Sequence, residues 1–290
     1  MKRILQNYIG ARWKPNGGAI TTNWFNHPRL VKYMDQCISP ETGKGVVGAV
    51  SHALRDEVAS RAISVGCGSG VKERRLLEAG VVDQFDLFEV SEAYAAAARQ
   101  GAKEEGFADR VRVIVDDAFS HETADQYDLV YWDHSLHHML NVDKAVSWSV
   151  AALKPGGWLI INDYVGPTRL VWHREEVDFA REFLKLHQSE LGLEPTSLKY
   201  KNVIDRLKLF LRDPSEAPQS DKIAASFREH CGEDMRSLGG VMIHLCAPFL
   251  GEPNDGLNEI YDELISYDRE ALEKGHNHFS FAAWQKQTAA

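Results

Sequence analysis

The chain has 290 residues, of which 44% are hydrophobic and 26% are charged, the composition of an ordinary globular protein. Its net charge of −9 at pH 7, with no run of Lys or Arg, argues against nucleic acid as a partner, because phosphate binding needs a concentrated basic face. The four cysteines lack metal-ligand spacing, and neither a signal-peptide pattern nor a stretch of about 18 apolar residues occurs, so we expect a cytoplasmic protein with no metal site and no membrane partner.

Residues 1–60 contain an aromatic, turn-rich stretch followed by two predicted helices, His27–Cys37 and Lys44–Asp56. From residue 61, apolar runs of strand length alternate with segments of helix length. The predicted strands are Arg61–Val65, Gln84–Glu89, Arg110–Val115, Tyr127–Trp132 and Trp158–Asp163, and the predicted helices between them are Val71–Ala79, Glu92–Glu105 and Asp143–Leu153. Strands and helices that alternate at this spacing predict an α/β domain whose parallel sheet is covered on both faces.

After Tyr164 this alternation stops. The elements predicted next are helices at Val171–Leu191 and Asn202–Arg212, a polar turn-rich segment at Asp213–Asp221, a helix ending near His230, and strands at about Asp234–Leu238 and His278–Trp284 with helical sequence between them. Residues 165–230 therefore form an insertion into the α/β pattern.

The segment Ala62–Gly70, AISVGCGSG, is an apolar run that stops at three glycines spaced G-x-G-x-G. Glycine has no Cβ, so these positions let the backbone turn tightly and approach a ligand closely. Glu89 follows about 20 residues after the turn, where a carboxylate can accept hydrogen bonds from both hydroxyls of a ribose. A dinucleotide fingerprint needs a glycine where this chain has Val71, which weakens an NAD interpretation. We therefore predict a nucleotide-type cofactor site at this turn.

Further motifs follow in a recognisable order. Asp116-Asp117-Ala118 comes after the third predicted strand, YDLVYWD at Tyr127–Asp133 is the fourth, and LKPGG at Leu153–Gly157 precedes the fifth. With the glycine loop and Glu89, these motifs resemble the class I S-adenosylmethionine-dependent methyltransferases over residues 60–165. The segments Asp163–Arg169, Asp213–Ala217 and Gly239–Val241 are similar to a bacterial subgroup that acts on small molecules and is often associated with sugar or secondary metabolism.

The resemblance implies a Rossmann-like, seven-stranded, mostly parallel sheet with an antiparallel last strand, for which FSFAAWQK at Phe279–Lys286 is the candidate. Residues 61–164 and 231–290 then form the methyltransferase core. We expect residues 1–60 to form a helical lid segment and residues 165–230 to form a helical cap over the acceptor substrate, because ligands of open α/β folds bind at the carboxyl edge of the sheet. A homodimer interface or a surface decoration is the alternative for the insertion.

The cofactor implied by the resemblance is S-adenosyl-L-methionine. The residues predicted to bind it are Gly66, Cys67, Gly68, Gly70, Glu89, Val90, Asp117, Ala118 and Asp133. Asp117 is placed beside the adenine, with Asp116 as the competing choice, since periodicity does not determine which of two adjacent carboxylates turns inward. Cys67 contributes backbone contacts, and Asp133 either binds the methionine amino group or orients a histidine. No metal is needed, because the cofactor carries the reactivity.

Methyl transfer to a hydroxyl or an ammonium is helped by a general base with a pKa near neutrality, for which histidine is suited. The loop after the fourth strand offers three histidines. The predicted catalytic residues are His138, which is the first choice, His137, His134 and Tyr164, and the predicted substrate contacts are Arg169, His173 and Glu216. Each has a structural alternative: a histidine in such a loop commonly packs under the following helix, and Trp172 with its neighbours can anchor one.

We therefore predict an S-adenosylmethionine-dependent methyltransferase that acts on an oxygen or nitrogen of a small-molecule acceptor in specialised metabolism. One alternative is an enzyme that binds the same cofactor but catalyses a cyclisation or elimination without methylation. Another is a non-catalytic cofactor-binding protein. Both stay open because fold does not determine function. An NAD-dependent oxidoreductase ranks last because of Val71 and the P-G-G element.

Overall fold

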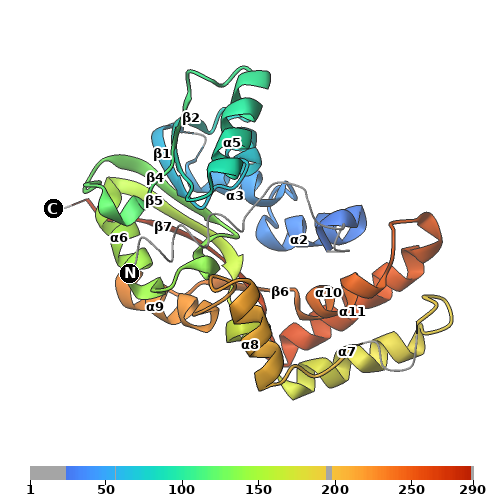
Figure 1. Ribbon diagram of the computed structural model, residues 1–290. Coiled ribbons are helices and arrows are strands. Elements are labelled where there is room, and N and C mark those ends of the chain that lie inside the picture. The colour runs from blue at the N-terminus through green and yellow to red at the C-terminus, as the bar shows by residue number, and fades with distance from the viewer. Residues whose placement is uncertain (1–23, 56, 194–197, 289–290) are drawn as a thin grey trace.

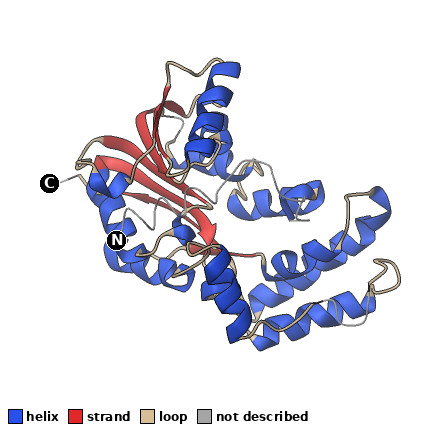
Figure 2. Ribbon diagram, viewed as in Figure 1, coloured by secondary structure: helices blue, strands red, loops and turns tan. Residues whose placement is uncertain are grey.

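The computed structural model describes residues 24–55, 57–193 and 198–288. Its centre is a seven-stranded sheet with the strand order β3-β2-β1-β4-β5-β7-β6 (Figure 1, Figure 2). The strands are β1 Ala59–Val65, β2 Val82–Phe88, β3 Val111–Ile114, β4 Tyr127–Asp133, β5 Leu153–Tyr164, β6 Arg236–Gly239 and β7 Phe279–Gln285. Neighbouring strands from β1 to β5 are parallel, whereas β7 is antiparallel to both β5 and β6. The predicted fold class, a Rossmann-like sheet with an antiparallel last strand, is confirmed.

Side chains of the central strands alternate between two hydrophobic cores, one on each face of the sheet. In β4, Leu129 and Tyr131 belong to one core, and Val130 and Trp132 belong to the other. All four side chains are buried. Strands buried on both faces require near-continuous apolar sequence, which is why these segments are recognisable as strands.

Helices cover both faces of the sheet. On one face, α4 (Val71–Glu78) contacts β2 and α5 (Glu92–Glu104) contacts β3. On the other face, α6 (Val142–Ala152) contacts β4 and β5 and packs with α9 (Ile223–Cys231). The chain moves outward from β1 to β2 and β3, but in the opposite direction from β4 to β5. Right-handed crossovers therefore place α6 on the face opposite α4 and α5. The reversal between β1 and β4 creates a crevice at the carboxyl ends of these strands, where ligands of such folds bind.

A group of further helices extends from the antiparallel edge of the sheet (Figure 1). The remaining α-helices are α2 Pro28–Ile38, α3 Gly45–Ala53, α7 Arg174–Leu186, α8 Val203–Arg212, α10 Val241–Cys246 and α11 Asn258–Glu273. The short 3-10 turns are Trp24–Asn26, Ala118–Ser120, Leu136–His138, Thr168–Leu170, Ser220–Lys222, Ala247–Phe249 and Asp255–Leu257. Within the described ranges, no helix has the length and apolar character needed to cross a bilayer.

Asp268 of α11 joins the helices at this edge. Its carboxylate accepts the N–H groups of Gly240 and Met242 at the start of α10, each at 2.9 Å. Gly240 has a φ of 78°, and a Cβ there would lie 2.4 Å from the ring of Phe279. Both the backbone conformation and the lack of space therefore require glycine at this position.

Most differences from the sequence prediction concern where elements begin. LKPGG is predicted to precede the fifth strand, but β5 already begins at Leu153, which pairs with Tyr127 before the register shifts. Helix α7 begins at Arg174 instead of Val171, because the backbone N–H of His173 donates to the carboxylate of Glu176 at 3.0 Å and marks the helix start. The division into lid, core and cap stays a prediction, and residues 1–23 of the proposed lid lie outside the described residues.

Candidate active site

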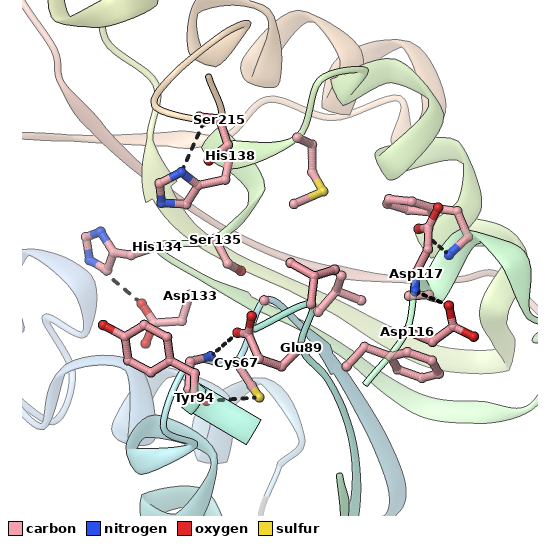
Figure 3. Close-up of a pocket in the computed structure, with 18 of the residues that line it drawn as sticks. Cys67, Glu89, Tyr94, Asp116, Asp117, Asp133, His134, Ser135, His138 and Ser215 are labelled. Atoms are coloured by element: carbon pink, nitrogen blue, oxygen red, sulfur yellow. Dashed lines mark hydrogen bonds and ion pairs between the residues drawn. The ribbon is translucent and has the colours of Figure 1, made fainter. Parts of the chain in front are cut away.

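A cavity of about 560 Å³ lies at the carboxyl ends of β1, β2 and β4, at the reversal of the strand order (Figure 3). Its walls come from the loops after β1, β2, β3 and β4, with Ser215 of the insertion at the rim. Of the predicted cofactor residues, the cavity is lined by Gly66, Cys67, Gly68, Glu89, Val90, Asp117, Ala118 and Asp133. Gly70 does not line it. The structure thus brings together residues that are up to 67 positions apart in the sequence.

The glycine loop forms the floor of the cavity. Gly66, Gly68 and Gly70 have φ values of 71°, 56° and 69°, a left-handed conformation that other residues rarely adopt. The N–H of Gly66 donates to the carbonyl of Phe88 at 2.8 Å, and a Cβ on Gly66 would lie 3.2 Å from the Cβ of Ser135. Gly70 instead precedes α4, and a Cβ added there would lie 3.3 to 3.4 Å from atoms of Leu87, Ala98 and Arg74. Its role is therefore to start the helix.

Glu89 connects the glycine loop with the start of α5. One carboxylate oxygen accepts the N–H of Gly68 at 2.9 Å and the other accepts the N–H of Ser91 at 2.8 Å. Burial raises the pKa of the Glu89 carboxyl, and these N–H groups oppose that rise. A carboxylate has about four lone-pair directions, so each oxygen can accept a further hydrogen bond from a ligand in the cavity.

The two adjacent carboxylates after β3 have different local roles. Asp117 accepts the N–H of Phe119 at 3.1 Å and so caps the following 3-10 turn, while Asp116 accepts the N–H of Asp117 at 2.8 Å and lies 3.2 Å from the ring of His121. Both line the cavity, so either carboxylate can accept a hydrogen bond from a ligand.

Asp133, at the end of β4, is held by four groups. Its carboxylate accepts the hydroxyl of Tyr131 and the amide of Asn162, each at 2.8 Å, and lies 3.5 Å from the ammonium of Lys72 and 3.7 Å from the ring of His134. Burial opposes ionisation, but Lys72, His134 and the two donors hold the pKa of Asp133 below its ordinary value. Asp133 is therefore an anion in the wall of the cavity.

Two cavity residues were missed in the sequence. Lys72 donates to the backbone carbonyl of Asp133 at 2.7 Å and places a positive charge in the wall. Ser135 also lines the cavity, and its buried hydroxyl has no hydrogen-bond partner among the described residues. An unpaired buried hydroxyl costs free energy unless a ligand or water binds it, so Ser135 marks a polar contact point. In the sequence, the only indication of Lys72 and Ser135 is that they stand next to motifs that were recognised.

Asp163 organises the loop that carries the histidines, and it was also absent from the predicted site. One oxygen of its carboxylate accepts the N–H groups of Ser135 and Leu136 at 2.9 and 2.7 Å. The other oxygen lies 2.5 Å from Nδ1 of His137. Burial tends to lower the pKa of His137, but the adjacent Asp163 outweighs it and raises the pKa, while the pKa of Asp163 is lowered to about 2. The two residues form a buried ion-pair-type dyad.

The three predicted histidines have different environments. His134 and His138 line the cavity, whereas His137 does not, and its Nε2 lies 4.0 Å from the carboxylate of Glu216. Burial lowers the pKa of His134 to about 4 and that of His138 to about 3. Nδ1 of His138 lies 3.1 Å from the carbonyl of Ser215, so this nitrogen carries the proton.

The other predicted catalytic and substrate residues do not line the cavity. The hydroxyl of Tyr164 donates to the carbonyl of Pro167 at 3.1 Å, and its ring lies 6.1 Å from that of His137. Arg169 donates to the carbonyls of Pro214 and Glu216 at 2.7 and 3.0 Å, which fixes the loop that holds Ser215. His173 marks the start of α7. Burial raises the pKa of Glu216.

Residues 63–159 match the family model described as "Methyltransferase domain". This part of the chain is therefore similar to methyltransferase domains. The curated "Ubiquinone biosynthesis O-methyltransferase" of Bordetella avium (strain 197N) is 32% identical over 103 residues, which are 35% of this chain and 42% of that protein. The chain thus spans less than half the length of this relative.

Two solved structures align with the chain at low sequence identity. An O-methyltransferase family protein from Burkholderia thailandensis is 14% identical with a TM-score of 0.49, over 92% of this chain and 62% of that one. The cyclase SpnF is 17% identical with a TM-score of 0.48, over 86% of this chain and 83% of that one. The matched residues include the glycine loop, Glu89, Asp133 and the three histidines, whereas Asp163, Tyr164 and the insertion lie beyond the match.

Proposed function

We propose that this protein is an S-adenosylmethionine-dependent methyltransferase that acts on an oxygen or nitrogen of a small-molecule acceptor. The observation that carries the proposal is the cavity, in which a left-handed glycine loop, the carboxylate of Glu89 and the unpaired hydroxyl of Ser135 face one space. A wall with several such hydrogen-bonding groups suits a ligand with a sugar and an amino acid part.

The residues present fit this cofactor. Glu89 has the remaining lone pairs to accept two ribose hydroxyls, and Asp117 or Asp116, which both line the cavity, would accept the adenine amino group. Asp133 and Ser135 provide an anion and a hydroxyl for the methionine part. When bound, S-adenosylmethionine supplies an electrophilic methyl group on a sulfonium.

We assign the general base to His137 in place of His138. Asp163 accepts the hydrogen bond of Nδ1–H of His137, so the lone pair of the neutral ring is on Nε2, and the raised pKa makes this nitrogen a stronger base than that of His138. His138 has a pKa of about 3 and is a weak base, but its ring lies 4.0 Å from that of His137 in the cavity wall, where it can position an acceptor.

The acceptor side of the site involves the insertion. Glu216 lies 4.0 Å from Nε2 of His137, and Arg169 holds the backbone on both sides of Ser215. We therefore propose that Glu216 contacts the acceptor, while Arg169 positions the loop that presents it. Tyr164 packs beside His137 and supports the histidine ring. The specialised metabolic role and the cytoplasmic location remain part of this proposal.

Calorimetry with the purified protein tests the cofactor assignment. We expect S-adenosylmethionine and its demethylated product to bind and NADH not to bind. Binding of NADH alone would refute the assignment. Mass spectrometry of a panel of hydroxylated and amine acceptors then tests the reaction, because a methyltransferase adds one methyl group, whereas an isomerised product without cofactor consumption would indicate the non-methylating alternative.

A matched pair of variants tests the base. His137→Gln should lower turnover by about a hundredfold or more, the usual contribution of a general base, with near-normal cofactor affinity. His138→Gln should change the KM for the acceptor more than turnover. If His138→Gln lowers turnover and His137→Gln mainly changes the KM for the acceptor, the general base is His138.

A further inference from the structure

Three polar side chains form a hydrogen-bonded chain that the proposed reaction does not use. A carboxylate oxygen of Glu176 on α7 lies 3.3 Å from Nε2 of His278, whose Nδ1 lies 3.1 Å from Nδ1 of His244 on α10. Glu176 and His278 are buried, and His244 is half-buried. The three residues meet at the antiparallel edge of the sheet, where α7 contacts α10 and His278 precedes β7 (Figure 1). Burying polar groups costs free energy, so this chain calls for an explanation.

The hydrogen bonds determine which ring nitrogens carry protons. Burial opposes ionisation of Glu176, but its hydrogen bond with His278 holds the pKa of Glu176 below the ordinary value, so this side chain is a carboxylate and only accepts. Nε2 of His278 therefore donates to Glu176. Burial lowers the pKa of His278, so its ring is neutral near pH 7 and has a lone pair on Nδ1. The Nδ1–H of His244 donates to that lone pair.

This arrangement leaves Nε2 of His244 as a hydrogen-bond acceptor. Burial lowers the pKa of His244 well below 6.5, and the adjacent His278 acts in the same direction. The neutral ring carries its proton on Nδ1 and its lone pair on Nε2. Nε2 has no hydrogen-bond partner in the part of the chain that the structure describes. A nitrogen with so low a pKa is a poor general base, but it can still accept a hydrogen bond from a ligand.

His244 lies close to the residues of the candidate active site. Its ring centroid is 5.3 Å from that of Tyr164, which is 6.1 Å from that of His137. Phe279 makes a second connection, since its ring lies 5.7 Å from His244 and 5.6 Å from His134 in the cavity wall. His137 and His134 also contribute to the lowered pKa of His244. One side chain therefore separates His244 from the proposed base, and one separates it from the cavity.

The insertion packs against the same histidine. The ring of Trp172 lies 5.6 Å from that of His244, and the ammonium of Lys201 lies 3.7 Å from the centroid of the indole ring. Both residues belong to the proposed cap, residues 165–230. His244 thus lies where the core meets the cap, which is the side of the site assigned to the acceptor.

We propose that His244 binds the acceptor, with Nε2 accepting a hydrogen bond from a hydroxyl or amine group other than the one that is methylated. Glu176 and His278 are positioning residues that keep the proton of the His244 ring on Nδ1. The inference rests on the proposed methyl transfer, in which His137 contacts the reacting group. The acceptor is then a molecule with at least two hydroxyl or amine groups, one at each histidine.

NMR of the full chain labelled with ¹⁵N-histidine tests the proton positions without an acceptor. The ¹⁵N shifts distinguish protonated from unprotonated ring nitrogens. At pH 7 we expect His244 to be protonated on Nδ1 alone and His278 on Nε2 alone. Glu176→Gln, whose amide can both donate and accept, should give a mixture of the two neutral forms of His244. A proton on Nε2 of His244 in the wild type would overturn the proposal.

Two variants of His244 test the contact with the acceptor, by kinetics with the compound that the protein methylates best. Asparagine places its amide near the position of Nδ1, so His244→Asn keeps a partner for His278 but has no acceptor at Nε2. Glutamine reaches the position of Nε2. We expect His244→Asn to raise the KM for the acceptor by about tenfold, with kcat and the affinity for the demethylated cofactor near wild type, and His244→Gln to raise this KM less.

His230→Gln is the control, because His230 is a half-buried histidine on α9 whose Nε2 lies 2.8 Å from the carboxylate of Asp143. It should leave the KM unchanged. If His244→Asn lowers only the free energy of unfolding and leaves the KM unchanged, the chain of side chains is structural and the proposal is wrong. If the protein binds the demethylated cofactor but methylates no compound, the methyl transfer is refuted, and the acceptor contact with it, whichever tautomer the NMR shows.

Discussion

Asp163 and His137 come from neighbouring strand ends and meet with 2.5 Å between Oδ1 and Nδ1. The same carboxylate accepts the N–H groups of Ser135 and Leu136, so one buried anion determines both the path of the loop after β4 and the orientation of the imidazole. Because Asp163 also raises the pKa of His137, its position links the fold of this loop to the base strength of the histidine.

Asp163→Asn should therefore lower the pKa of His137. Asparagine has nearly the same shape and keeps an oxygen acceptor, but it removes the charge that stabilises the imidazolium. NMR titration of the His137 ring should show its midpoint at a lower pH than in the wild type, and the rising limb of the kcat/KM profile should shift in the same direction. An unchanged midpoint would show that Asp163 does not control this histidine.

The stability of the dyad has its own pH dependence. The pKa of Asp163 is lowered from 3.8 to about 2, so its stabilisation is present above pH 3.8 and is lost as the pH falls toward 2. The raised pKa of His137 acts in the opposite sense, because its stabilisation is present at low pH and is lost as the pH rises through the folded-state pKa. In an acid titration, the Asp163→Asn variant should not show the loss of folding stability that the wild type shows below pH 3.8.

Glu89→Ala should weaken cofactor binding by about 1.5 to 3 kcal/mol, the range for hydrogen bonds to a charged group. The substitution removes the ribose acceptor and also leaves the N–H groups of Gly68 and Ser91 without their partner. Calorimetry with the demethylated cofactor measures the loss. Glu92→Ala is the control, since Glu92 is exposed on α5 and pairs only with Arg99 among the described residues. If both variants bind the demethylated cofactor with equal affinity, Glu89 does not contact it.

Gly66→Ala and Gly80→Ala form a matched pair. Both glycines have a φ of 71°, so alanine should destabilise either site by about 1 to 2 kcal/mol. A Cβ at Gly66 would lie 3.2 Å from Ser135 in the cavity floor, whereas one at Gly80 meets nothing within 4 Å. Urea unfolding should show similar losses for the two variants, and only Gly66→Ala should also weaken cofactor binding.

Glu73 should make the protein less stable as the pH rises toward neutrality. Its side chain is buried, one oxygen accepts the hydroxyl of Ser64 at 2.7 Å, and the other has no partner among the described residues. Burial raises its pKa from 4.5 to about 7, so the folded state holds a proton that the unfolded chain releases between these values. The resulting loss of stability is on the order of 3 kcal/mol.

Glu73→Gln removes this titration and should flatten the change in unfolding free energy between pH 5 and pH 8. Urea unfolding at the two pH values measures it, with the exposed Glu78→Gln as the control on the same helix. An equal loss in the wild type and in Glu73→Gln would assign the effect to other groups.

Much of the fold could be predicted from local sequence patterns. Strands such as Tyr127–Asp133 are recognisable because a sheet covered on both faces needs a near-continuous run of apolar side chains. The glycine loop and Glu89 are recognisable because backbone conformation and a strand end restrict the residue types that fit. The start of β5 at Leu153 was not predictable, since its pairing depends on the partner strand.

The alternating α/β order, the turn at Gly66 and the carboxylates at the strand ends could all be predicted from the sequence, because they follow from interactions between residues close in the chain. Only the tertiary structure decided that Asp163 holds His137 and that Ser135 opens into the cavity. Each of these depends on which distant segments pack together, and burial then sets the pKa values and the unpaired groups that local sequence cannot reveal.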